Sequence, residues 1–295
     1  AEAAEAGRLP QPPAPPPGGP SLGPLAIWEP GVAPTFSEGP KDPILERLFG
    51  LIGVRHRYYV EVGTQTGEQC NSRYLRVRYG FRGLMLDDNY QNPEVNQWRH
   101  RVTPAIAAEL FRRYDVPHEF DLLSLDTDGN EWLLWLSLQG LFSPRVVILE
   151  YSPSLPFDED LLVRYTDFPV HRLCLAALQR MPWLGGGSVT GLLALGRSWG
   201  YHLVHLVGGG TTDLIFVRDD VLEESGLAFP GQDDPHALCA LAKYQAEPAA
   251  RFCGRGWPGI QAPPQELLTT SRAALAGDYQ LSAGWGPERL QEAFC

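Results

Sequence analysis

Short apolar runs alternate with helix-length amphipathic segments between Tyr58 and Arg218, and this alternation limits what the chain can fold into. Strands that are separated by helices pair in parallel through right-handed crossovers. The last two runs, Tyr201–Leu206 and Asp213–Val217, are separated by little more than a glycine turn, so we expect them to form an antiparallel hairpin. The sequence therefore predicts an α/β fold with a three-layer, Rossmann-like sheet that is mostly parallel and closed at one edge by the hairpin.

The expected strands are short, and four of them carry a carboxylate at or next to their last residue. They are Tyr58–Val62, Gly83–Asp87, Phe120–Asp126, Arg145–Glu150, Tyr201–Leu206 and Asp213–Val217. The helices expected between them are Glu68–Tyr79, Ala105–Tyr114, Glu131–Leu138 and Val189–Trp199. In the helix at 105–114, Thr103 is placed to cap the start, and Ile106 and Leu110 are placed on one apolar face.

Composition divides the chain into three parts. Residues 1–43 hold 12 of the 27 prolines, which is typical of an extended stalk or linker and is also compatible with docking to a proline-binding module. Residues 44–222 carry the strand and helix pattern. Residues 223–295 lose that pattern and are expected to form an irregular helical extension. Its expected helices are His236–Gln245, Gln265–Ala276 and Pro287–Phe294.

The charge balance limits the partners of the protein. There are 24 Lys and Arg residues against 35 Asp and Glu residues, and the formal net charge is −11. Nucleic acids and anionic membranes are bound mainly through clustered Lys and Arg, so we do not expect either as the main partner. The sequence also lacks an apolar stretch of the roughly 18 residues that span a bilayer.

The cysteines and the N-terminus bear on the cellular compartment. The sequence begins at Ala1 rather than Met, as expected for a chain that has lost a leader or for a fragment. The five cysteines are scattered and lack the C-x-x-C spacing of a zinc site, although Cys239 and Cys253 could pair in an oxidising compartment. No Asn-x-Ser/Thr sequon supports secretion. Secretion or the secretory-pathway lumen is favoured slightly over the cytoplasm.

A glycine turn follows the first strand and points to a ligand site. The stretch from Glu61 to Gly67 reads E-x-G-x-x-x-G, with the first glycine at Gly63. A strand that ends in such a turn and leads into a helix leaves backbone N–H groups available to a nucleotide-like cofactor. Gln65 stands where a dinucleotide motif has its middle glycine, so the turn differs from that motif.

Acidic side chains stand at the ends of the first four expected strands, at Glu61, Asp87, Asp126 and Glu150, and Asp88 and Asp128 extend two of them. In an open parallel sheet these ends line one crevice, where ligands bind. Asp87 is placed to accept hydrogen bonds from ribose hydroxyls. Such an acidic crevice favours a positively charged cofactor over a polyphosphate.

The segments Val60–Gly67, Gly83–Asp87 and Phe120–Glu131 together resemble class I S-adenosylmethionine-dependent methyltransferases, in particular the FkbM-like branch. That branch has an Asp-x-Glu-Gly-x-Glu signature, and here the corresponding residues read Asp126-Thr-Asp-Gly-Asn-Glu131. The resemblance covers roughly residues 55–220. It implies S-adenosylmethionine as cofactor. The cofactor site that it implies, with the adjoining residues, is Glu61, Gly63, Thr64, Gly67, Asp87, Asp88 and Asp126.

The reaction expected from this resemblance is methyl transfer to an oxygen of a small-molecule or glycan acceptor. A hydroxyl acceptor needs a base that removes its proton, and Asp126, Asp128 and His171 are the candidates. Two other functions remain open. One is a catalytically silent methyltransferase-like interaction module, and the other is a carbohydrate-active enzyme that uses two opposed carboxylates.

A metal site is not predicted. Asp126, Asp128 and Glu131 resemble part of a calcium loop, but apolar residues follow where a full loop continues with oxygen ligands. Trp132 and Trp135 in this apolar segment are expected to belong to the core.

Overall fold

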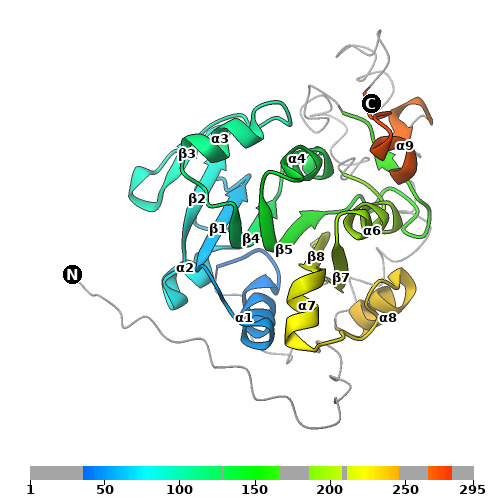
Figure 1. Ribbon diagram of the computed structural model, residues 1–295, viewed down its shortest axis with the longest axis horizontal. Coiled ribbons are helices and arrows are strands. Elements are labelled where there is room, and N and C mark those ends of the chain that lie inside the picture. Colours follow the sequence, from blue (N-terminus) through cyan, green and yellow to red (C-terminus); the bar gives the residue numbers. More distant parts are fainter. Residues whose placement is uncertain (1–35, 128, 166–185, 208–210, 246–264, 281–295) are drawn as a thin grey trace.

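The computed structural model describes residues 36–127, 129–165, 186–207, 211–245 and 265–280 (Figure 1). These ranges form a mostly parallel seven-stranded sheet between two layers of helices, together with a separate two-stranded antiparallel sheet. The predicted Rossmann-like α/β fold is therefore confirmed. The expected helix at 287–294 lies outside the described residues.

The strands of the large sheet follow the order β3-β2-β1-β4-β5-β8-β7. The order reverses between β1 and β4, and β8 is antiparallel to both β5 and β7, as the predicted hairpin requires. The strands are β1 (Tyr58–Val62), β2 (Arg82–Asp87), β3 (Gln97–Arg99), β4 (Glu119–Leu125), β5 (Ser143–Glu150), β7 (Tyr201–Leu206) and β8 (Asp213–Arg218). The short strands β6 (Leu162–Val163) and β9 (Leu268–Thr269) form the second sheet.

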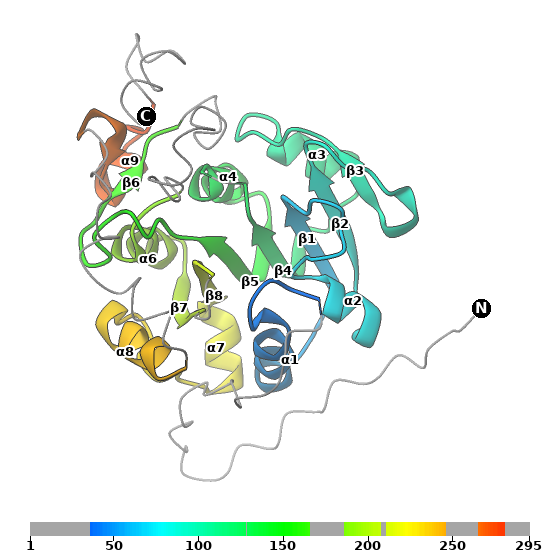
Figure 2. The ribbon, with the colours of Figure 1, turned by 180° about the vertical axis from the view of Figure 1, so that it is seen from behind.

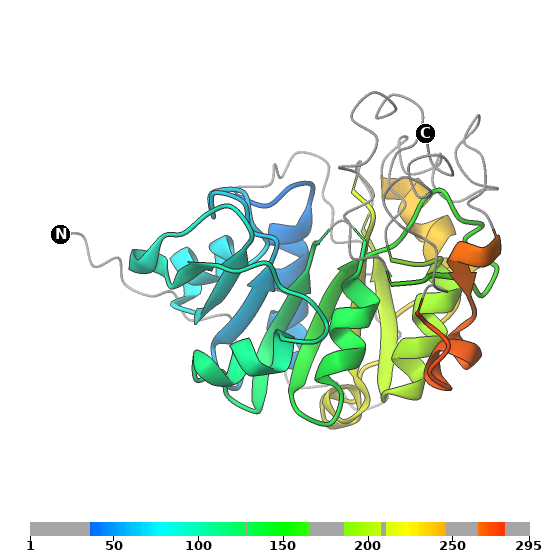
Figure 3. The ribbon, with the colours of Figure 1, turned by 90° about the horizontal axis from the view of Figure 1, so that it is seen from above.

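Helices cover both faces of the large sheet (Figures 1 and 2). One face packs against α3 (Ala107–Arg113), α4 (Glu131–Leu138) and α6 (Val189–Ser198). The other packs against α1 (Lys41–Ile52), α2 (Arg73–Tyr79) and α7 (Asp219–Ser225). Figure 3 shows α4 and α6 on the near face and α1 behind the strands. The remaining helices are α8 (Pro235–Gln245), α9 (Ser271–Leu275), and the 3₁₀ turns η1 (Pro93–Val95) and η3 (Gln265–Leu267).

Alternation along the strands divides the core into these two layers. Val60 and Val62 of β1 face the α3–α4–α6 layer, whereas Tyr59 faces the α1–α2–α7 layer. Trp132 and Trp135 are 0% and 1% exposed, so their predicted place in the core is confirmed. Full burial of a large apolar side chain contributes about 1.5–3 kcal/mol.

Two predicted helices begin elsewhere, and one strand was missed. The helix expected from Glu68 begins at Arg73, because residues 63–72 form a loop that Glu61 holds. The helix expected from Ala105 begins at Ala107, and Ile106 is 37% exposed instead of facing the core. Strand β3 was not predicted, because its sequence Gln-Trp-Arg has no apolar alternation.

The folded domain begins before residue 44, where the sequence placed its boundary. Helix α1 begins at Lys41, and the Asp42 carboxylate accepts hydrogen bonds from the backbone N–H groups of Phe36 and Ser37. Lys41 is buried and forms an ion pair with Asp213 at 2.7 Å. Residues 36–43 therefore belong to the domain rather than to the proline-rich linker.

Part of the C-terminal extension is packed onto the domain. Strand β9 pairs with β6, and Arg164 forms an ion pair with Asp278. Helix α7 crosses the boundary that was predicted at residue 222. Cys239 is disulfide-bonded, whereas Cys253, the partner considered for it from the sequence, lies outside the described residues.

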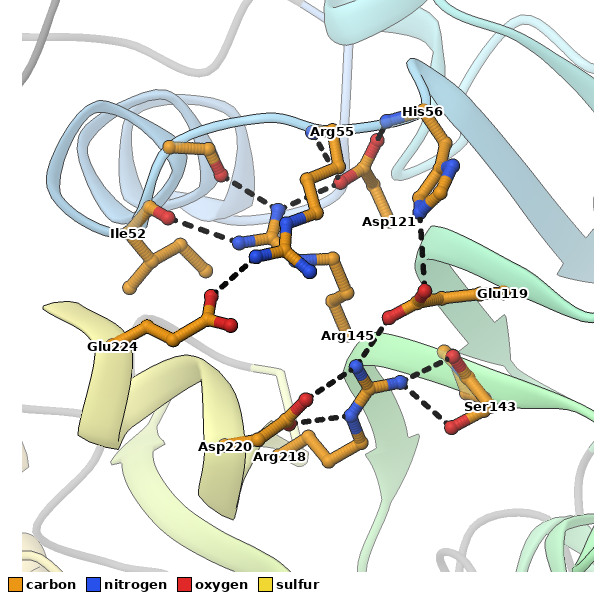
Figure 4. A network of polar contacts seen from close by, with 12 residues as sticks. Ile52, Arg55, His56, Glu119, Asp121, Ser143, Arg145, Arg218, Asp220 and Glu224 are labelled. Carbon is orange, nitrogen blue, oxygen red and sulfur yellow. Dashed lines mark hydrogen bonds and ion pairs between the residues drawn. The ribbon is translucent and has the colours of Figure 1, made fainter.

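The amino edge of the sheet, where the parallel strands begin, is held by arginine–carboxylate pairs (Figure 4). Arg145 at the start of β5 lies 2.8 Å from the buried carboxylate of Asp121 and donates to the Ile52 and Gly53 carbonyls at the end of α1. Arg218 at the end of β8 contacts Glu119 and Asp220. Asp121 also accepts the backbone N–H groups of residues 55–57. This edge ties α1, β4, β5 and β8 together.

Candidate functional site

The glycine turn after β1 meets the end of β4 where the strand order reverses. Gly63 has φ +84°, and a Cβ at this position would lie 1.5 Å from the carbonyl oxygen of Asp126. The backbone N–H of Asp126 donates to the Val62 carbonyl at 3.0 Å, and that of Gly63 donates to the Leu86 carbonyl at 2.8 Å. Only glycine fits this contact. A reversal of strand order at the carboxyl edge is where open α/β sheets bind ligands.

Glu61 holds the loop that leads from this turn into α2. Its buried carboxylate accepts the backbone N–H groups of Asn71 at 2.7 Å and Ser72 at 2.9 Å, and the Ser72 hydroxyl also donates to it. Burial raises the pKa of the Glu61 carboxyl, and the hydrogen bonds from Ser72 oppose this shift. Glu61 therefore holds the loop through the backbone N–H groups of residues 71 and 72 and is a positioning residue.

The interior of the turn is occupied by the amide of Gln97 from β3. Its Nε2 donates to the Thr64 hydroxyl at 2.8 Å and to the Gln65 carbonyl at 2.6 Å. A Cβ on Gly67 would lie 3.3 Å from the other end of this amide, at Oε1. Thr64 and Gly67 thus surround a side chain of the chain itself. The spacing of the turn residues gave no signal for Gln97.

Some of the backbone donors that we expected to be uncovered are bonded within the chain. The N–H of Gly63 donates to the Leu86 carbonyl, that of Gln65 to the Asp87 carboxylate, and that of Gly67 to the Thr64 carbonyl. The expectation of an uncovered set of donors is therefore wrong for these groups. Their bonds give the turn a defined shape.

Asp87 at the end of β2 links the turn to the next loop. Its Oδ2 accepts the Gln65 N–H at 2.7 Å, and its Oδ1 accepts the N–H groups of Asn89 at 2.8 Å and Tyr90 at 3.0 Å. An ionised carboxylate has about four acceptor positions, so Asp87 keeps capacity for one further donor such as a ribose hydroxyl. Asp88 is exposed beside it and bonds to the Asn89 amide.

Three further acids stand at the same edge on β4, β5 and β8. Asp126 follows β4 and Glu150 ends β5, and both are partly exposed. Glu150 lies opposite Asp213, the first residue of β8, in the strand register. Asp213 is 1% exposed and is paired with Lys41. Because Asp87, Asp126 and Glu150 lie along one edge, they do not form the two opposed walls that a carbohydrate-active site requires.

Glu131 at the start of α4 adds a buried carboxylate. Its Oε1 accepts the Thr127 N–H at 2.9 Å, the Thr127 hydroxyl at 3.0 Å and the Gly129 N–H at 2.8 Å. Its Oε2 is buried and has no hydrogen-bond partner among the described residues. A Cβ on Gly186 would lie 3.3 Å from this oxygen and 2.8 Å from the Glu150 carbonyl, which places Glu131 beside the end of β5. From the sequence, Glu131 was considered as a metal ligand and as the last residue of the methyltransferase-like signature.

Burial and like charges change the acidity of these groups. Burial raises the pKa of Glu150 well above its usual range, and the neighbouring Asp126, Asp213 and Glu131 raise it further. The pKa of Glu131 is also raised by burial, against the hydrogen bonds that it accepts. Carboxyl groups whose pKa is shifted by burial and by neighbouring charges are typical of functional sites.

The structure brings together most of the predicted site. Asp128 and His171 lie outside the described residues, so their roles remain predictions. In the ranges that are described, no group of three His, Cys, Asp or Glu side chains has an arrangement that could hold a metal ion.

Sequence reasoning missed Lys41, Gln97 and Asp213, which come from distant segments. The residues that meet at the carboxyl edge are Glu61, Gly63, Thr64, Gly67, Asp87 and Asp126, with Asp88 at the exposed rim.

A separate cavity of about 270 Å³ lies beside α4. Its lining is mostly apolar and comes from four segments that are separate in the sequence. The lining residues are Pro104, Ala105, Leu133, Leu136, Ser137, Tyr165, Tyr279 and Gln280. None of the carboxylates described above lines it, so this cavity is distinct from the acidic site.

No protein-family model matches this sequence, and no curated protein matches it significantly. Within the part of the chain that the structure describes, no helix is both long and apolar enough to cross a membrane.

Proposed function

We propose that the protein is an S-adenosylmethionine-dependent methyltransferase that acts on an oxygen of a small-molecule or glycan acceptor. The observation that carries this proposal is the contact between the glycine turn of β1 and the end of β4, with Asp87 on the neighbouring strand. This contact stands at the reversal of strand order, where cofactors bind in open α/β sheets.

The charge of the crevice supports this cofactor over a nucleotide polyphosphate. Asp87, Asp126 and Glu150 would repel phosphate groups, whereas a sulfonium and an ammonium are attracted to them. In this proposal Asp87 accepts a ribose hydroxyl, and the backbone around Gly63 holds the amino-acid part of the cofactor. When bound, S-adenosylmethionine supplies an electrophilic methyl group.

The protein's own contribution is positioning and proton transfer. In-line displacement requires that the acceptor oxygen and the methyl group are held in line. Glu61 and Gln97 fix the backbone of the glycine turn, which would hold the cofactor in place. Asp126 is partly exposed at the edge of the site, where it can take the hydroxyl proton. Asp128 and His171 remain candidates for the same role.

Calorimetric titration with S-adenosylmethionine and S-adenosylhomocysteine tests the proposal. We expect saturable binding, and we expect Asp87→Ala to weaken it at least about tenfold, since one lost hydrogen bond to a charged group is worth about 1.5–3 kcal/mol. Glu223→Ala, an exposed change on α7, is the control and should leave the affinity unchanged. Absence of binding at millimolar ligand would reject the proposal.

The position of Gln97 favours a second candidate, a catalytically silent interaction module. Its amide already fills the interior of the turn. If Gln97 blocks the cofactor, Gln97→Ala should strengthen binding of S-adenosylmethionine. If Gln97 shapes the turn for the cofactor, the same change should weaken binding, because Thr64 and Gln65 lose the partner that holds them.

A further inference from the structure

Strand β3 and helix α3 form a basic surface at the end of the large sheet opposite to β7. Figures 1 and 2 show the two elements side by side. Residues 97–113, which span both, hold four arginines and one glutamate, in a chain whose formal net charge is −11. The structure describes this part of the chain without a gap, from residue 36 to residue 127. We call the exposed arginines and the partly exposed rings beside them the β3–α3 surface, and its members are Trp98, Arg99, His100, Arg112, Arg113 and Tyr114.

The three arginines of this surface lack the ion pairs that other arginines form. In the described part of the chain, no carboxylate forms an ion pair with Arg99, Arg112 or Arg113. The arginines of β5, α6 and β8, in contrast, each contact an aspartate. Glu109 stands one turn before Arg112 and Arg113 on α3, but it is exposed and is not paired with them. The three guanidinium groups therefore face solvent without a carboxylate partner among the described residues.

Contacts between rings connect α3 to the end of β3. Trp98 stacks on Tyr114, with ring centroids 5.6 Å apart and an angle of 22° between the ring planes. The Tyr114 hydroxyl lies 2.7 Å from Nε2 of His100, and the Arg113 guanidinium lies 5.9 Å from the centre of the Tyr114 ring. His100 directly follows Arg99 in the chain. The arginines of the two elements thus belong to one continuous surface.

The positive charge of this surface affects His100. Burial and the charge of Arg113 lower the pKa of the His100 imidazole. A nearby cation disfavours the protonated form of a histidine, and it attracts an anion for the same electrostatic reason. The direction of this shift agrees with a surface that is suited to a negatively charged ligand.

Structural reasons explain only part of the arrangement. Charge on an edge strand prevents pairing with other strands, which would explain Arg99. A cation in the last turn of a helix is favoured by the helix dipole, which would explain Arg112 and Arg113. Neither reason requires that the three side chains lie on one surface beside partly exposed aromatic rings. Recognition of an anionic ligand accounts for the three together.

The β3–α3 surface adjoins the carboxyl edge of the sheet. In the register of β2 and β3, Arg99 lies opposite Asp87, and the backbone N–H of His100 donates to the Asp87 carbonyl at 2.7 Å. Asp87 is the residue that would accept the cofactor ribose in the proposed function. An acceptor made of several units can therefore reach the proposed site while its other units contact the arginines.

We propose that the β3–α3 surface binds an anionic oligosaccharide, whose carboxylate or sulfate groups pair with the arginines. A guanidinium group binds such planar or multi-oxygen anions through two parallel hydrogen bonds. The rings of Trp98 and Tyr114 supply apolar area for sugar rings between the charges. This deepens the proposed function, on which it rests only for the role of the oligosaccharide as the methyl acceptor.

The charge of the whole chain favours an oligosaccharide over a nucleic acid. Double-stranded DNA carries about one negative charge per 1.7 Å of helix axis, so it would continue from this surface onto the rest of an acidic chain. An acidic oligosaccharide distributes its charges over separate sugar rings, and a short one ends within the surface. An acidic peptide is the remaining alternative, and the experiment includes it.

Calorimetric titration of the full chain tests the proposal. The ligands are an oligogalacturonate hexamer, which carries carboxylates, a heparin-derived hexasaccharide, which also carries sulfates, and maltohexaose, which is neutral. We expect saturable binding of at least one anionic oligosaccharide, no binding of maltohexaose, and an affinity that falls as the NaCl concentration rises. Hexaglutamate and an oligodeoxythymidylate are the competing polyanions. Tighter binding of either one would overturn the choice of an oligosaccharide.

Four variants assign the binding to this surface. Arg99→Gln and Arg113→Gln should each weaken it about tenfold, because each removes hydrogen bonds to a charged group. Arg99→Lys keeps the charge but loses the paired hydrogen bonds, so its affinity should lie between those of wild type and Arg99→Gln. Arg272→Gln is the matched control, since Arg272 is exposed on α9, which lies beside α6 rather than α3 (Figure 1), and it should leave the affinity unchanged. Equal weakening by Arg272→Gln would overturn the assignment, because binding would then follow overall charge. Circular dichroism and thermal unfolding establish that the variants are folded.

The outcomes separate this proposal from the proposed function. If S-adenosylmethionine binds and neither anionic oligosaccharide does, the β3–α3 surface is wrong while the proposed function stands. If an oligosaccharide binds and S-adenosylmethionine does not, the proposed function is wrong while the surface stands. If both bind, methyl-labelled S-adenosylmethionine decides the acceptor role. Label in the oligosaccharide supports that role, and its absence overturns it.

Discussion

The two edges of the large sheet treat their acidic side chains in opposite ways. At the amino edge, each carboxylate labelled in Figure 4 lies against an arginine. At the carboxyl edge, Asp213 is paired with Lys41, whereas Glu131 keeps a buried oxygen without a partner among the described residues. The same residue types thus connect secondary structure elements at one edge and accumulate negative charge at the other.

The pKa values of the carboxyl groups shift in opposite directions at the two edges. The hydrogen bond from Arg218 lowers the pKa of Glu119 and also that of Asp220 at the amino edge. Burial and neighbouring carboxylates raise the pKa of Glu150 at the carboxyl edge. A lowered pKa means that the fold stabilises the ionised form, and a raised pKa means that the fold destabilises it. The arginine pairs of the amino edge are therefore expected to stabilise the fold, and ionisation of Glu150 at the carboxyl edge is expected to destabilise it.

The largest expected effect is at the amino edge. Asp121→Ala leaves the Arg145 guanidinium buried without its ionic partner and removes the acceptor for the N–H groups of residues 55–57. We expect a loss of about 3–5 kcal/mol in the free energy of unfolding, as when one member of a buried ion pair is removed. Urea denaturation measures it. A loss below 1 kcal/mol would show that this network does not stabilise the fold.

The second prediction concerns His205 near the carboxyl end of β7, which is buried and whose Nε2 has no partner among the described residues. Burial lowers its pKa from 6.5 to about 4. The unfolded chain therefore binds a proton between these values while the folded chain does not. The free energy of unfolding is therefore not reduced by His205 above about pH 6.5. It falls by about 3 kcal/mol as the pH drops to 4, because protonation favours the unfolded chain.

Denaturation curves between pH 4 and 7.5 test this for His205→Leu, which cannot take up a proton. The variant should show the smaller loss of stability on acidification. His118→Leu, at an exposed histidine, is the control and should keep the wild-type dependence. If the stability of wild type and of His205→Leu depends on pH in the same way, His205 is not the group that destabilises the fold on acidification.

At the carboxyl edge, Glu150→Gln should stabilise the protein by about 1 kcal/mol near pH 7, because it removes a charge that the neighbouring carboxylates repel. The folded pKa of Glu150 is raised, so ionisation destabilises the fold as the pH rises through that pKa. The gain should therefore disappear toward pH 4, where the carboxyl is neutral in both states. A variant that is less stable than wild type at pH 7 would indicate that Glu150 is ion-paired after all. Thermal unfolding against pH measures the difference.

The smallest effect is expected for Glu224→Gln, which breaks an ion pair with Arg55 at the amino edge. The side chains of Arg55 and Glu224 are 45% and 53% exposed, so solvent screens their attraction. We expect a change within about 1 kcal/mol, measured by the same urea titration. A larger loss would mean that the exposed part of this edge is coupled to the buried Asp121–Arg145 pair.

Much of the fold was predictable from the sequence. Helix α4 and strand β7 have the predicted bounds, Glu131–Leu138 and Tyr201–Leu206. The hairpin of β7 and β8 was predictable because the connection is too short for a crossover. The start of α2 was not, because it depends on Glu61 accepting the N–H groups of residues 71 and 72.

The candidate site was predictable only in part. The glycine turn and the acids at the strand ends are local patterns, so Gly63, Asp87 and Asp126 were found. Gln97 was missed because the amide that fills the turn comes from a strand without apolar alternation. Lys41 was assigned to the linker, although its partner Asp213 lies 172 residues further along the chain.

The sequence by itself determined the alternation of strands and helices, the closing hairpin and the edge at which the acids would gather. These follow from periodicity and from connection length, which are local properties of a chain. Only the tertiary structure decided which acids meet a cation, which turn inward to hold a loop and which repel one another. Acidity and ion pairing depend on distance and on exposure to water, and both are set by contacts between residues that are remote in the sequence.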